Sequence, residues 1–324
     1  MTSTAALFQR FTNFLIMHSH ANSQPKVVLA GGTGFLGRHL KRHFEQLNYR
    51  VITLSRARKF VPNQVHWDAR KLGAWTTELE GAALLINLTG RSVDCRYNEA
   101  NKHEILTSRV DSTRVLGQAV ARCQTPPAVW LNSSTATIYE DTANDAPANT
   151  EARGLIGRGF SVSIATAWEE AFRAAKAPRT RKVALRTSIV LANDGGAFPV
   201  LTRLAKLGLC TPQGSGEQWI SWLHVDDFCR AVAFLATQTQ ESGPFNLCAP
   251  HPLPNREFNT LLARRFRPWV RLPQPEWLLR VGALVLRTET ELVLKSRKVV
   301  PERLLSLGFE FSYPTCKAAF AALT

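Results

Sequence analysis

The most constraining feature of this chain is a glycine-rich turn that joins an apolar segment to an amphipathic one. Residues 27–30 form an apolar run with the composition of a buried parallel strand. After the glycines, Leu36, Leu40 and Phe44 recur at helical spacing. The glycines of the turn are Gly31, Gly32, Gly34 and Gly37. A strand, a glycine turn and a helix in this order predict a dinucleotide-binding site.

Each part of this turn has a physical role toward a dinucleotide. Glycine lets the backbone turn tightly and lets a pyrophosphate approach without a Cβ atom in the way. The helix that follows points its unpaired N–H groups and the positive end of its dipole at the same group. The alternative is a turn with a purely structural role. The residues expected to contact the cofactor here are Gly31, Thr33, Gly34, Phe35, Leu36 and Gly37.

The end of the next expected strand, residues 50–54, indicates which dinucleotide binds. Enzymes that select NAD usually place an acidic residue there, about 20 residues beyond the glycines, to bond the ribose hydroxyls. This chain instead has Ser55 and Arg56, followed by more basic residues. A carboxylate would repel the 2′-phosphate of NADP, whereas a hydroxyl and a guanidinium bind it. We therefore predict NADP(H) as the cofactor; the alternative is a basic surface loop.

The composition is that of a folded, basic protein. The chain has 324 residues, 45% of them hydrophobic, which is enough for one large domain or two modest ones. Its net charge of +15 attracts phosphate-bearing partners. The basic residues are spread over the whole chain and form no zinc-finger or aromatic RNA-binding motif. We therefore favour a small anionic ligand over specific nucleic-acid binding.

The cysteines and the N-terminal segment bear on the location of the protein. The six cysteines are far apart and form no CxxC pair, which favours reduced thiols in the cytoplasm over a metal site. No apolar run is long enough to span a bilayer, so no membrane association is expected. Residues 1–24 lack the basic start and cleavage site of a secretory signal. We expect a poorly ordered arm there, with a weak organelle presequence as the alternative and Met17 as a second candidate start.

Strand and helix patterns alternate along the first part of the chain and change character after it. Such alternation implies right-handed crossovers and a parallel sheet. Further strands are expected at residues 65–68, 82–88, 128–132 and 182–191, and helices at 98–122 and 161–176. From residue 195 short helices predominate. They are expected at 201–207, 225–237, 255–266, 275–286, 290–295, 301–307 and 315–323, with a strand-like segment at 219–223.

The expected architecture is a Rossmann-type doubly wound parallel sheet with a smaller, mainly helical C-terminal lobe. We divide the chain into a dinucleotide-binding domain at residues 25–195 and a substrate-side lobe at residues 196–324. Parts of 225–250 are expected to pack on the first domain. In such a sheet the carboxyl ends of the strands gather the ligand-binding loops.

An ordered set of short motifs resembles the extended short-chain dehydrogenase/reductases, the NAD(P)-dependent epimerases and dehydratases. The similarity is greatest to an atypical subgroup of epimerase-family proteins of unknown substrate, which has a small C-terminal domain of its own. The motifs are Gly31-Gly32-Thr33-Gly34-Phe35-Leu36-Gly37-Arg38, Trp67-Asp68, Asn87-Leu88-Thr89-Gly90, Ser108-Arg109, Trp168-Glu169-Glu170, Leu185-Arg186-Thr187, Gly214-Ser215-Gly216 and residues 222–227 and 299–309.

The resemblance implies roles for several of these positions. Asp68 would lie beside the adenine of the cofactor. Ser134 or Thr135, after the fifth strand, would face the nicotinamide. The residues that would line the cofactor after the fourth strand are Leu88, Thr89 and Gly90.

The chain departs from the family pattern at the catalytic pair. The family uses a tyrosine four residues before a lysine, and the lysine lowers the pKa of the tyrosine so that it can transfer a proton. None of the four tyrosines here has a lysine at that spacing. The atypical subgroup also tends to lack the pair, so the usual proton transfer is not expected. Ile220 and Ser221 stand where epimerases have Arg-Asp, which argues against a sugar-nucleotide substrate.

The remaining catalytic candidates lie after the fifth expected strand and on the long helix. Ser134 and Thr135 carry hydroxyls that can bond a substrate carbonyl during hydride transfer; the alternative is a turn that only ends the strand. Tyr139 can supply an acid, or it can simply anchor its loop. Arg109 is predicted to reach an anionic group, which we assign to the cofactor; the alternative is a surface ion pair.

Two histidine groups have structural interpretations that outweigh catalytic ones. His224 precedes Asp226 and Asp227, and we expect an aspartate to cap the following helix with the histidine packed beneath it. His39 and His43 have metal-ligand spacing, but no third ligand is evident. We therefore expect a solvated helix face there and no metal site.

These observations lead to two hypotheses. The first is an NADP(H)-dependent oxidoreductase or epimerase-like enzyme, a monomer or homodimer, that moves a hydride between nicotinamide and a small carbonyl or alcohol. Ser134 or Thr135 would orient the substrate oxygen, and Tyr139 or a bound water would be the proton source. The second is an NADP(H)-sensing binding protein without catalysis, which the missing Tyr-Lys pair suggests. The sequence identifies neither the substrate nor the direction of reaction.

Overall fold

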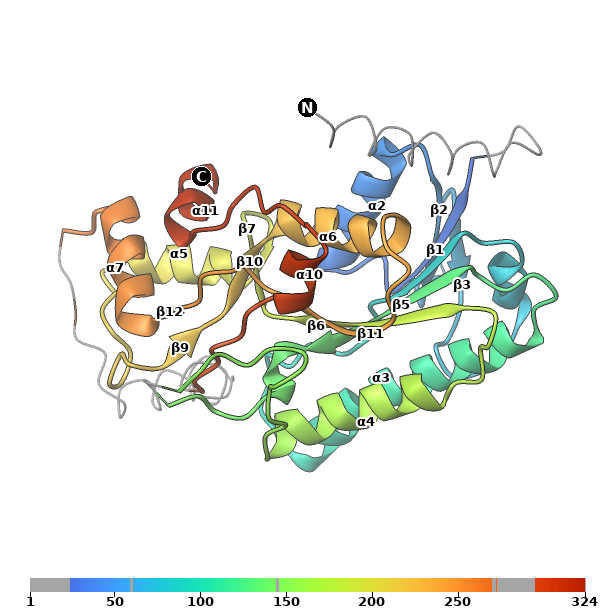
Figure 1. Cartoon of the computed structure of the whole chain (residues 1–324), viewed down its shortest axis with the longest axis horizontal. Helices are drawn as coiled ribbons and strands as arrows, with labels where there is room; N and C mark the ends of the chain where they lie inside the picture. The colour runs from blue at the N-terminus through green and yellow to red at the C-terminus, as the bar shows by residue number, and fades with distance from the viewer. Residues whose placement is uncertain (1–23, 59–60, 144–145, 270–271, 273–294, 324) are drawn as a thin grey trace.

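The computed structural model describes residues 24–58, 61–143, 146–269, 272 and 295–323. The expected N-terminal arm and the helices expected at 275–286 and 290–295 lie outside these residues, apart from residues 24 and 295. The described elements form a large sheet with helices on both faces, joined to a smaller lobe (Figure 1). No helix in the described ranges is long and apolar enough to cross a membrane.

The main sheet confirms the predicted doubly wound arrangement. In the described part of the chain it has seven parallel strands, in the order β11-β6-β5-β4-β1-β2-β3. The order reverses between β1 and β4, and this reversal is where such sheets form a ligand crevice at the carboxyl ends of the strands. The strands are β1 (Lys26–Ala30), β2 (Arg50–Ser55), β3 (Gln64–His66), β4 (Leu84–Asn87), β5 (Val129–Thr135), β6 (Arg181–Thr187) and β11 (Gly243–Leu247).

Helices cover both faces of this sheet because its strands are apolar on both sides. In β1, Val27 and Leu29 face one core, while Val28 and Ala30 face the other. Full burial of an aliphatic side chain of this size stabilises the fold by about 1.5–3 kcal/mol. Figure 1 shows one helix pair above the sheet and the other below it. The pairs are α2 (Phe35–Gln46) with α6 (Val225–Thr237), and α3 (Glu99–Arg122) with α4 (Phe160–Ala174).

The prediction of a single strand at residues 182–191 is wrong, because the chain passes from one sheet to another within this segment. The N–H and the hydroxyl of Ser188 both donate to the carbonyl of Leu247, at 3.0 and 3.1 Å, which holds a bend between two strands. Arg186, Thr187 and Ser188 interrupt the hydrophobic pattern here, but two of them lie within the first strand, so this interruption did not predict the bend. After the bend the chain enters a second sheet. Its strands are β7 (Ile189–Ala192), β8 (Gly195–Gly196) and β10 (Trp222–His224).

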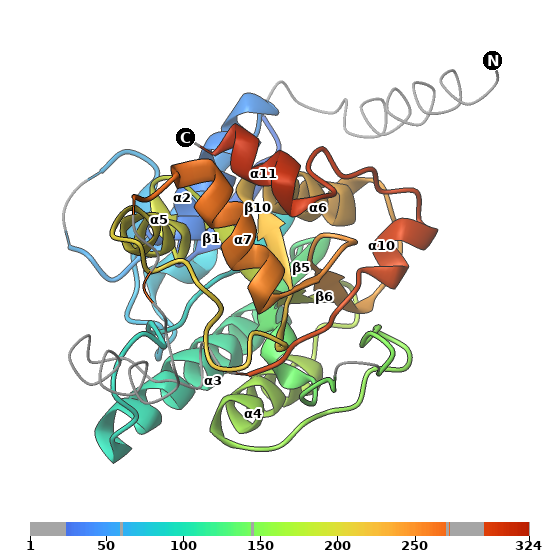
Figure 2. The same ribbon diagram turned by 90° about the vertical axis from the view of Figure 1, so that its left-hand side faces the viewer.

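The smaller lobe has a core of its own, in which Phe198, Trp222, Phe258 and Phe320 meet. Figure 2 shows α7 and α11 side by side at this end of the molecule. Strand β11 of the main sheet was not expected, because its Gly-Pro start is typical of a turn. The remaining described α-helices and β-strands are α5 (Phe198–Lys206), β9 (Trp219–Ile220), β12 (Leu253–Pro254), α7 (Asn255–Phe266), α10 (Glu302–Ser306) and α11 (Cys316–Ala322).

Part of the positive charge of the chain is structural. Three basic residues before and within β6 donate to the carbonyl groups at the ends of three helices, at 2.7–3.0 Å. Arg179 caps α3, Arg181 caps α6 and Lys182 caps α4. Cations are favourable there because the helix dipole is negative at its carboxyl end. These three charges therefore need no anionic partner.

Candidate cofactor and active site

The glycine turn between β1 and α2 is packed so closely that two of its positions have no room for a side chain. Gly31 has a φ of +78°, and a Cβ atom there would lie 3.0 Å from the carbonyl carbon of Leu88. A Cβ atom on Gly37 would lie 2.5 Å from the Cα atom of Gly32. The N–H of Gly34 donates to the carbonyl of Gly31 at 3.1 Å. These contacts hold the turn against the end of β4.

The first turn of α2 is open to a ligand. Gly34 is its N-cap and has no side chain to bond the first N–H groups, and no acidic residue lies in that turn. Thr89, whose backbone borders Gly31, has a buried hydroxyl oxygen with no hydrogen-bond partner among the described residues. Free N–H groups, a positive helix end and an unpaired hydroxyl fit an anionic ligand such as a dinucleotide pyrophosphate.

The end of β2 lies on the other side of the glycine turn. Ser55 is buried, and its hydroxyl accepts the backbone N–H two residues on at 3.2 Å. Arg56 is exposed, and within the described ranges no carboxylate pairs with it. Asp68 is also exposed; it accepts two backbone N–H groups at 2.8 Å, and these bonds lower the pKa of its carboxyl. The exposed guanidinium thus remains available to a phosphate.

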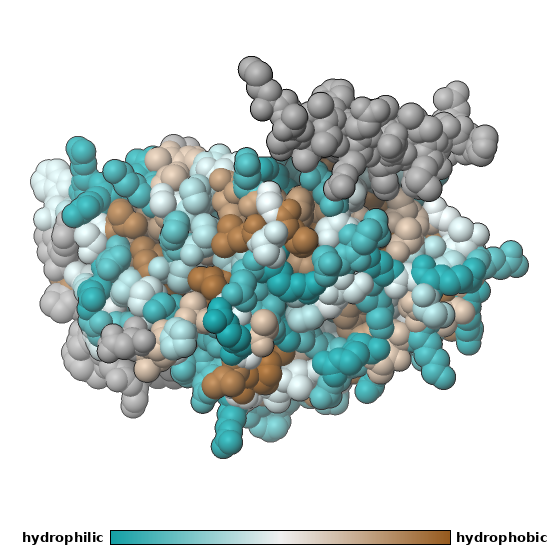
Figure 3. All heavy atoms as spheres, viewed as in Figure 1, coloured by the Kyte–Doolittle hydropathy of each residue, from teal (hydrophilic) through white to brown (hydrophobic). Residues whose placement is uncertain are grey.

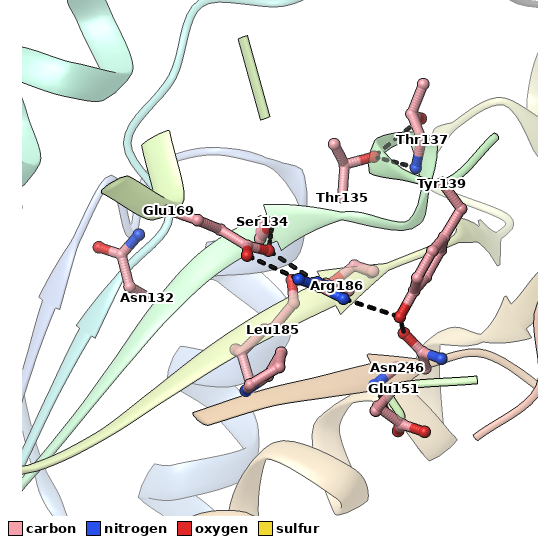
Figure 4. A network of polar contacts seen from close by, with 12 residues as sticks. Asn132, Ser134, Thr135, Thr137, Tyr139, Glu151, Glu169, Leu185, Arg186 and Asn246 are labelled. Carbon is pink, nitrogen blue, oxygen red and sulfur yellow. Dashed lines mark hydrogen bonds and ion pairs between the residues drawn. The ribbon is translucent and has the colours of Figure 1, made fainter. Parts of the chain in front are cut away.

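At the carboxyl end of β5, five side chains form one buried hydrogen-bonded network (Figure 4). The Ser134 hydroxyl donates to Glu169 at 2.6 Å, and Glu169 accepts two further hydrogen bonds from Arg186, both at 2.8 Å. Arg186 also donates to the Tyr139 hydroxyl at 2.9 Å, and that hydroxyl donates to Asn246 at 2.8 Å. Each of the five residues is less than a tenth exposed. The network therefore ties β5, β6, β11 and α4 together.

This network encloses two of the three predicted catalytic residues. The hydroxyls of Ser134 and Tyr139 are both engaged inside it, and burial raises the pKa of Tyr139. Thr135 lies outside the network and is half-buried. Its hydroxyl oxygen accepts the N–H of Thr137 at 3.1 Å and so caps the short helix η2 (Ala136–Ile138). The turn-forming role considered for Thr135 is therefore present in the structure.

Arg109 is held by backbone carbonyls, and it forms no surface ion pair with any of the described residues. Its Nη1 group donates to the carbonyls of Arg91 and Ile105, both at 3.0 Å. The guanidinium lies over the ring of Trp168, with its central carbon 5.1 Å from the ring centroid. Removal from water lowers the pKa of Arg109 to about 10. Among the described residues no carboxylate contacts this cation.

Two histidine expectations are corrected by tertiary contacts. His224, rather than an aspartate, caps α6, because its Nδ1 accepts the N–H of Asp226 at 3.1 Å. The buried carboxylate of Asp227 turns instead to two backbone N–H groups of the C-terminal segment, at 2.8 and 2.9 Å. His39 is only partly exposed, because the turn after β7 packs over α2 and the Nε2 atom of His39 lies 2.7 Å from Asp194.

Comparison with known proteins agrees with this geometry. Residues 27–248 match the sequence model of the NAD dependent epimerase/dehydratase family. The chain belongs to this family. Residues 274–323 match a second model, described as a domain of unknown function, DUF1731. The two matches confirm the resemblance to epimerase-family proteins that carry a C-terminal domain of their own.

Relatives of this family member cover almost its whole length. An epimerase family protein of Staphylococcus epidermidis is 30% identical over 296 residues, which are 91% of this chain and 97% of the relative. Human epimerase family protein SDR39U1, crystallised with NADPH, has a TM-score of 0.82 at 28% identity, covering 92% of this chain and 98% of its own. A nucleoside-diphosphate sugar epimerase of Corynebacterium glutamicum has a TM-score of 0.75 at 28% identity, covering 97% of this chain and 61% of its own.

Two contacts of this epimerase-family site had little signal in the sequence. The sequence gives no direct signal for the Glu169–Arg186 pair, because its members lie 17 residues apart on a helix and a strand that each carry other charges. The Phe35 ring fits against Gly195 and Gly196, where Cβ atoms would come within 2.4 and 2.8 Å of it. No local pattern predicts this second contact, because its partners lie far apart in the chain.

Proposed function

We propose that this protein is an NADP(H)-dependent oxidoreductase or epimerase-like enzyme that acts on a small carbonyl or alcohol. The observation that carries the proposal is the uncapped first turn of α2 beside the unpaired Thr89 hydroxyl, where the strand order reverses. The NADPH bound to the human relative supports it. When bound, the cofactor supplies or accepts a hydride at its nicotinamide ring.

The proposed binding mode gives each part of the cofactor its own residues. The first turn of α2 holds the pyrophosphate through backbone N–H groups. Ser55 and Arg56 hold the 2′-phosphate, and Asp68 lies by the adenine. The residues proposed to line the rest of the cofactor are Gly31, Thr33, Gly34, Phe35, Leu36, Gly37, Leu88, Thr89 and Gly90.

On the substrate side, we assign different roles to the predicted catalytic residues. Thr135 orients the substrate oxygen through its half-buried hydroxyl, which exchanges its hydrogen bond to the half-buried Thr137 hydroxyl for one to the substrate. Ser134 and Tyr139 are positioning residues, because their hydroxyls are already bonded within the buried network. A bound water is then the proton source, since the Tyr139 hydroxyl is fully enclosed. This arrangement accounts for chemistry without a tyrosine and lysine pair.

The proposed partner is a small molecule, and the protein acts as a monomer or homodimer in the cytoplasm. All six cysteines are described and none forms a disulfide, which supports a reducing compartment. A hollow of about 650 Å³ between α3 and α4 includes Leu106, Val110 and Ala171 in its lining. None of its lining residues is a proposed site residue, so we do not place the substrate there.

A binding protein that senses NADP(H) without catalysis is the second candidate. The enclosure of Ser134 and Tyr139 favours it, because two of three candidate groups are not open to a ligand. A screen of aldehydes, ketones and oxo acids for NADPH oxidation separates the two functions. Turnover with any of them rules out the sensor, whereas NADPH binding without turnover across the screen rules out the enzyme.

Replacement of Arg56 by alanine tests the choice of cofactor. Wild type is expected to bind NADPH more than about tenfold more tightly than NADH, because the guanidinium pairs with the 2′-phosphate. The Arg56→Ala variant should lose this preference while its affinity for NADH stays unchanged. Calorimetric titration of both proteins with both nucleotides measures the two effects. Arg70→Ala, which removes another exposed cation, is the control; equal losses in both variants would mean that the preference is only a general charge effect.

Replacement of Thr135 by valine tests the orienting hydroxyl. The variant is expected to lower kcat/KM by about 10²-fold or more with unchanged NADPH affinity, which is the usual effect of removing one donor to a developing oxyanion. Thr137→Val is the matched control, because it removes the same hydrogen bond between the two hydroxyls, 2.9 Å long, but keeps Thr135. Thr135→Ser should restore activity. Equal losses in the variants at 135 and 137 would assign both residues to the turn alone.

A further inference from the structure

Arg109 has two donor groups that no described residue uses. Its Nη1 group is held by two backbone carbonyls, whereas neither Nε nor Nη2 donates to any residue in the described ranges. Nε and Nη2 form one edge of the guanidinium, and Arg186 uses the same edge to hold the carboxylate of Glu169. Such an edge fits two oxygens of a carboxylate or phosphate.

The position of this guanidinium is fixed, and none of the described residues supplies a carboxylate that balances its charge. Gly90 presses against it, because a Cβ atom there would lie 3.0 Å from the central carbon and 3.3 Å from Nε. Trp168 lies under the group, and the nearby carboxylate of Glu104 is paired with Arg91. A desolvated cation without a counterion is unfavourable by several kcal/mol, so an anionic ligand would stabilise it.

The anionic groups of the cofactor are proposed to bind away from Arg109. The pyrophosphate is proposed at the first turn of α2, after β1, and the 2′-phosphate at the end of β2. Arg109 borders the residues after β4 and the Trp168 ring of α4, on the side of the sheet toward β5 and β6. In the proposed binding mode the nicotinamide ring, which carries no phosphate, faces this side. An anion bound by Arg109 there therefore belongs to the substrate.

We propose that Arg109 binds the carboxylate of an oxo-acid or hydroxy-acid substrate. The adjoining carbon–oxygen group would then lie between the nicotinamide and Thr135. This inference rests on the proposed function, and it changes the partner predicted for Arg109 from the cofactor to the substrate. A substrate that carries a phosphate would need the same two hydrogen-bond donors. The test therefore examines a carboxylate and a phosphate separately.

The test observes Arg109 directly in the full chain by ¹⁵N NMR of arginine Nε–H groups, assigned with Arg109→Lys. Pyruvate and glycolate are titrated into the NADPH complex, with methyl pyruvate as an uncharged control and inorganic phosphate as the second anion. The two carboxylates are expected to shift the Arg109 signal, and methyl pyruvate is not. Arg109→Lys and Arg109→Met should weaken carboxylate binding by about tenfold or more and leave NADPH affinity unchanged.

The other outcomes of this titration either overturn the inference or separate it from the proposed function. The inference is overturned if neither carboxylate shifts the signal, if only phosphate does, or if both variants lose NADPH affinity as much as carboxylate affinity. The wild-type titration does not depend on the folding of any variant. Repeating it without NADPH separates the two proposals: a carboxylate response in a chain that does not bind NADPH supports the carboxylate site and overturns the proposed function.

Discussion

Replacement of Glu169 by glutamine is expected to lower the free energy of unfolding by about 3–5 kcal/mol, the usual effect of removing one partner from a buried ion pair. Glutamine keeps the size of the side chain but leaves the Arg186 cation buried without a counterion. The side chains of the pair are 9% and 10% exposed, so water cannot replace the lost charge. Urea denaturation of both proteins, with unchanged slopes, measures the difference.

Two comparisons make this result specific to the pair. Glu170→Gln changes the next residue of the same helix, which is exposed, and should alter stability by less than about 0.5 kcal/mol. A double variant, Glu169→Leu with Arg186→Met, should recover most of the loss, because it removes both buried charges. A loss below about 1 kcal/mol for Glu169→Gln would mean that the network is open to water and does not hold the end of β5.

Replacement of Gly34 by alanine is expected to weaken NADPH binding by about tenfold or more while the fold stays intact. A Cβ atom at this position would touch only the carbonyl oxygen of Gly31, at 3.4 Å, which is an ordinary contact. The backbone angle of Gly34, with φ at −72°, is also open to alanine. The added methyl group would instead occupy the approach of the pyrophosphate. Calorimetric titration with NADPH and a thermal melt measure the two properties separately.

Two other glycines serve as controls for this effect. A Cβ atom on Gly73 would meet the nearest atom at 3.5 Å, so Gly73→Ala should change neither property. Gly37→Ala should lose the fold together with the affinity, because its Cβ atom would meet backbone at 2.5 Å. Unchanged NADPH affinity in Gly34→Ala would place the pyrophosphate away from the turn and so contradict the proposed binding mode.

Much of the fold was predictable because its determinants are local. Strand β1, the glycine turn and α2 follow one another within a short segment, and helices α6 and α7 begin and end where the periodicity indicates. Prediction failed at residues 182–191, where a bend held by Ser188 and Leu247 divides one segment between two sheets. The polar residues Arg186 and Thr187 belong to the first of the two strands, so the polar break in this segment did not mark the position of the bend.

The candidate site was also predictable only in part. Sequence order and residue type indicated the glycines, Ser55 and Arg56, because the roles proposed for them depend on their positions at or just after the ends of β1 and β2. They could not show that Ser134 and Tyr139 join one buried network, since its members come from four separate elements.

The sequence by itself determined a parallel α/β sheet, a dinucleotide turn at its centre and a basic end to the second strand, because each depends on residues close together in the chain. Only the tertiary structure decided which polar groups are enclosed and which stay open to a ligand. That distinction depends on contacts between distant segments, such as the Glu169–Arg186 pair and the packing of Gly90 on Arg109. Membership of the buried hydrogen-bonded network, rather than residue type, therefore separates the positioning residues from those proposed to bind cofactor and substrate.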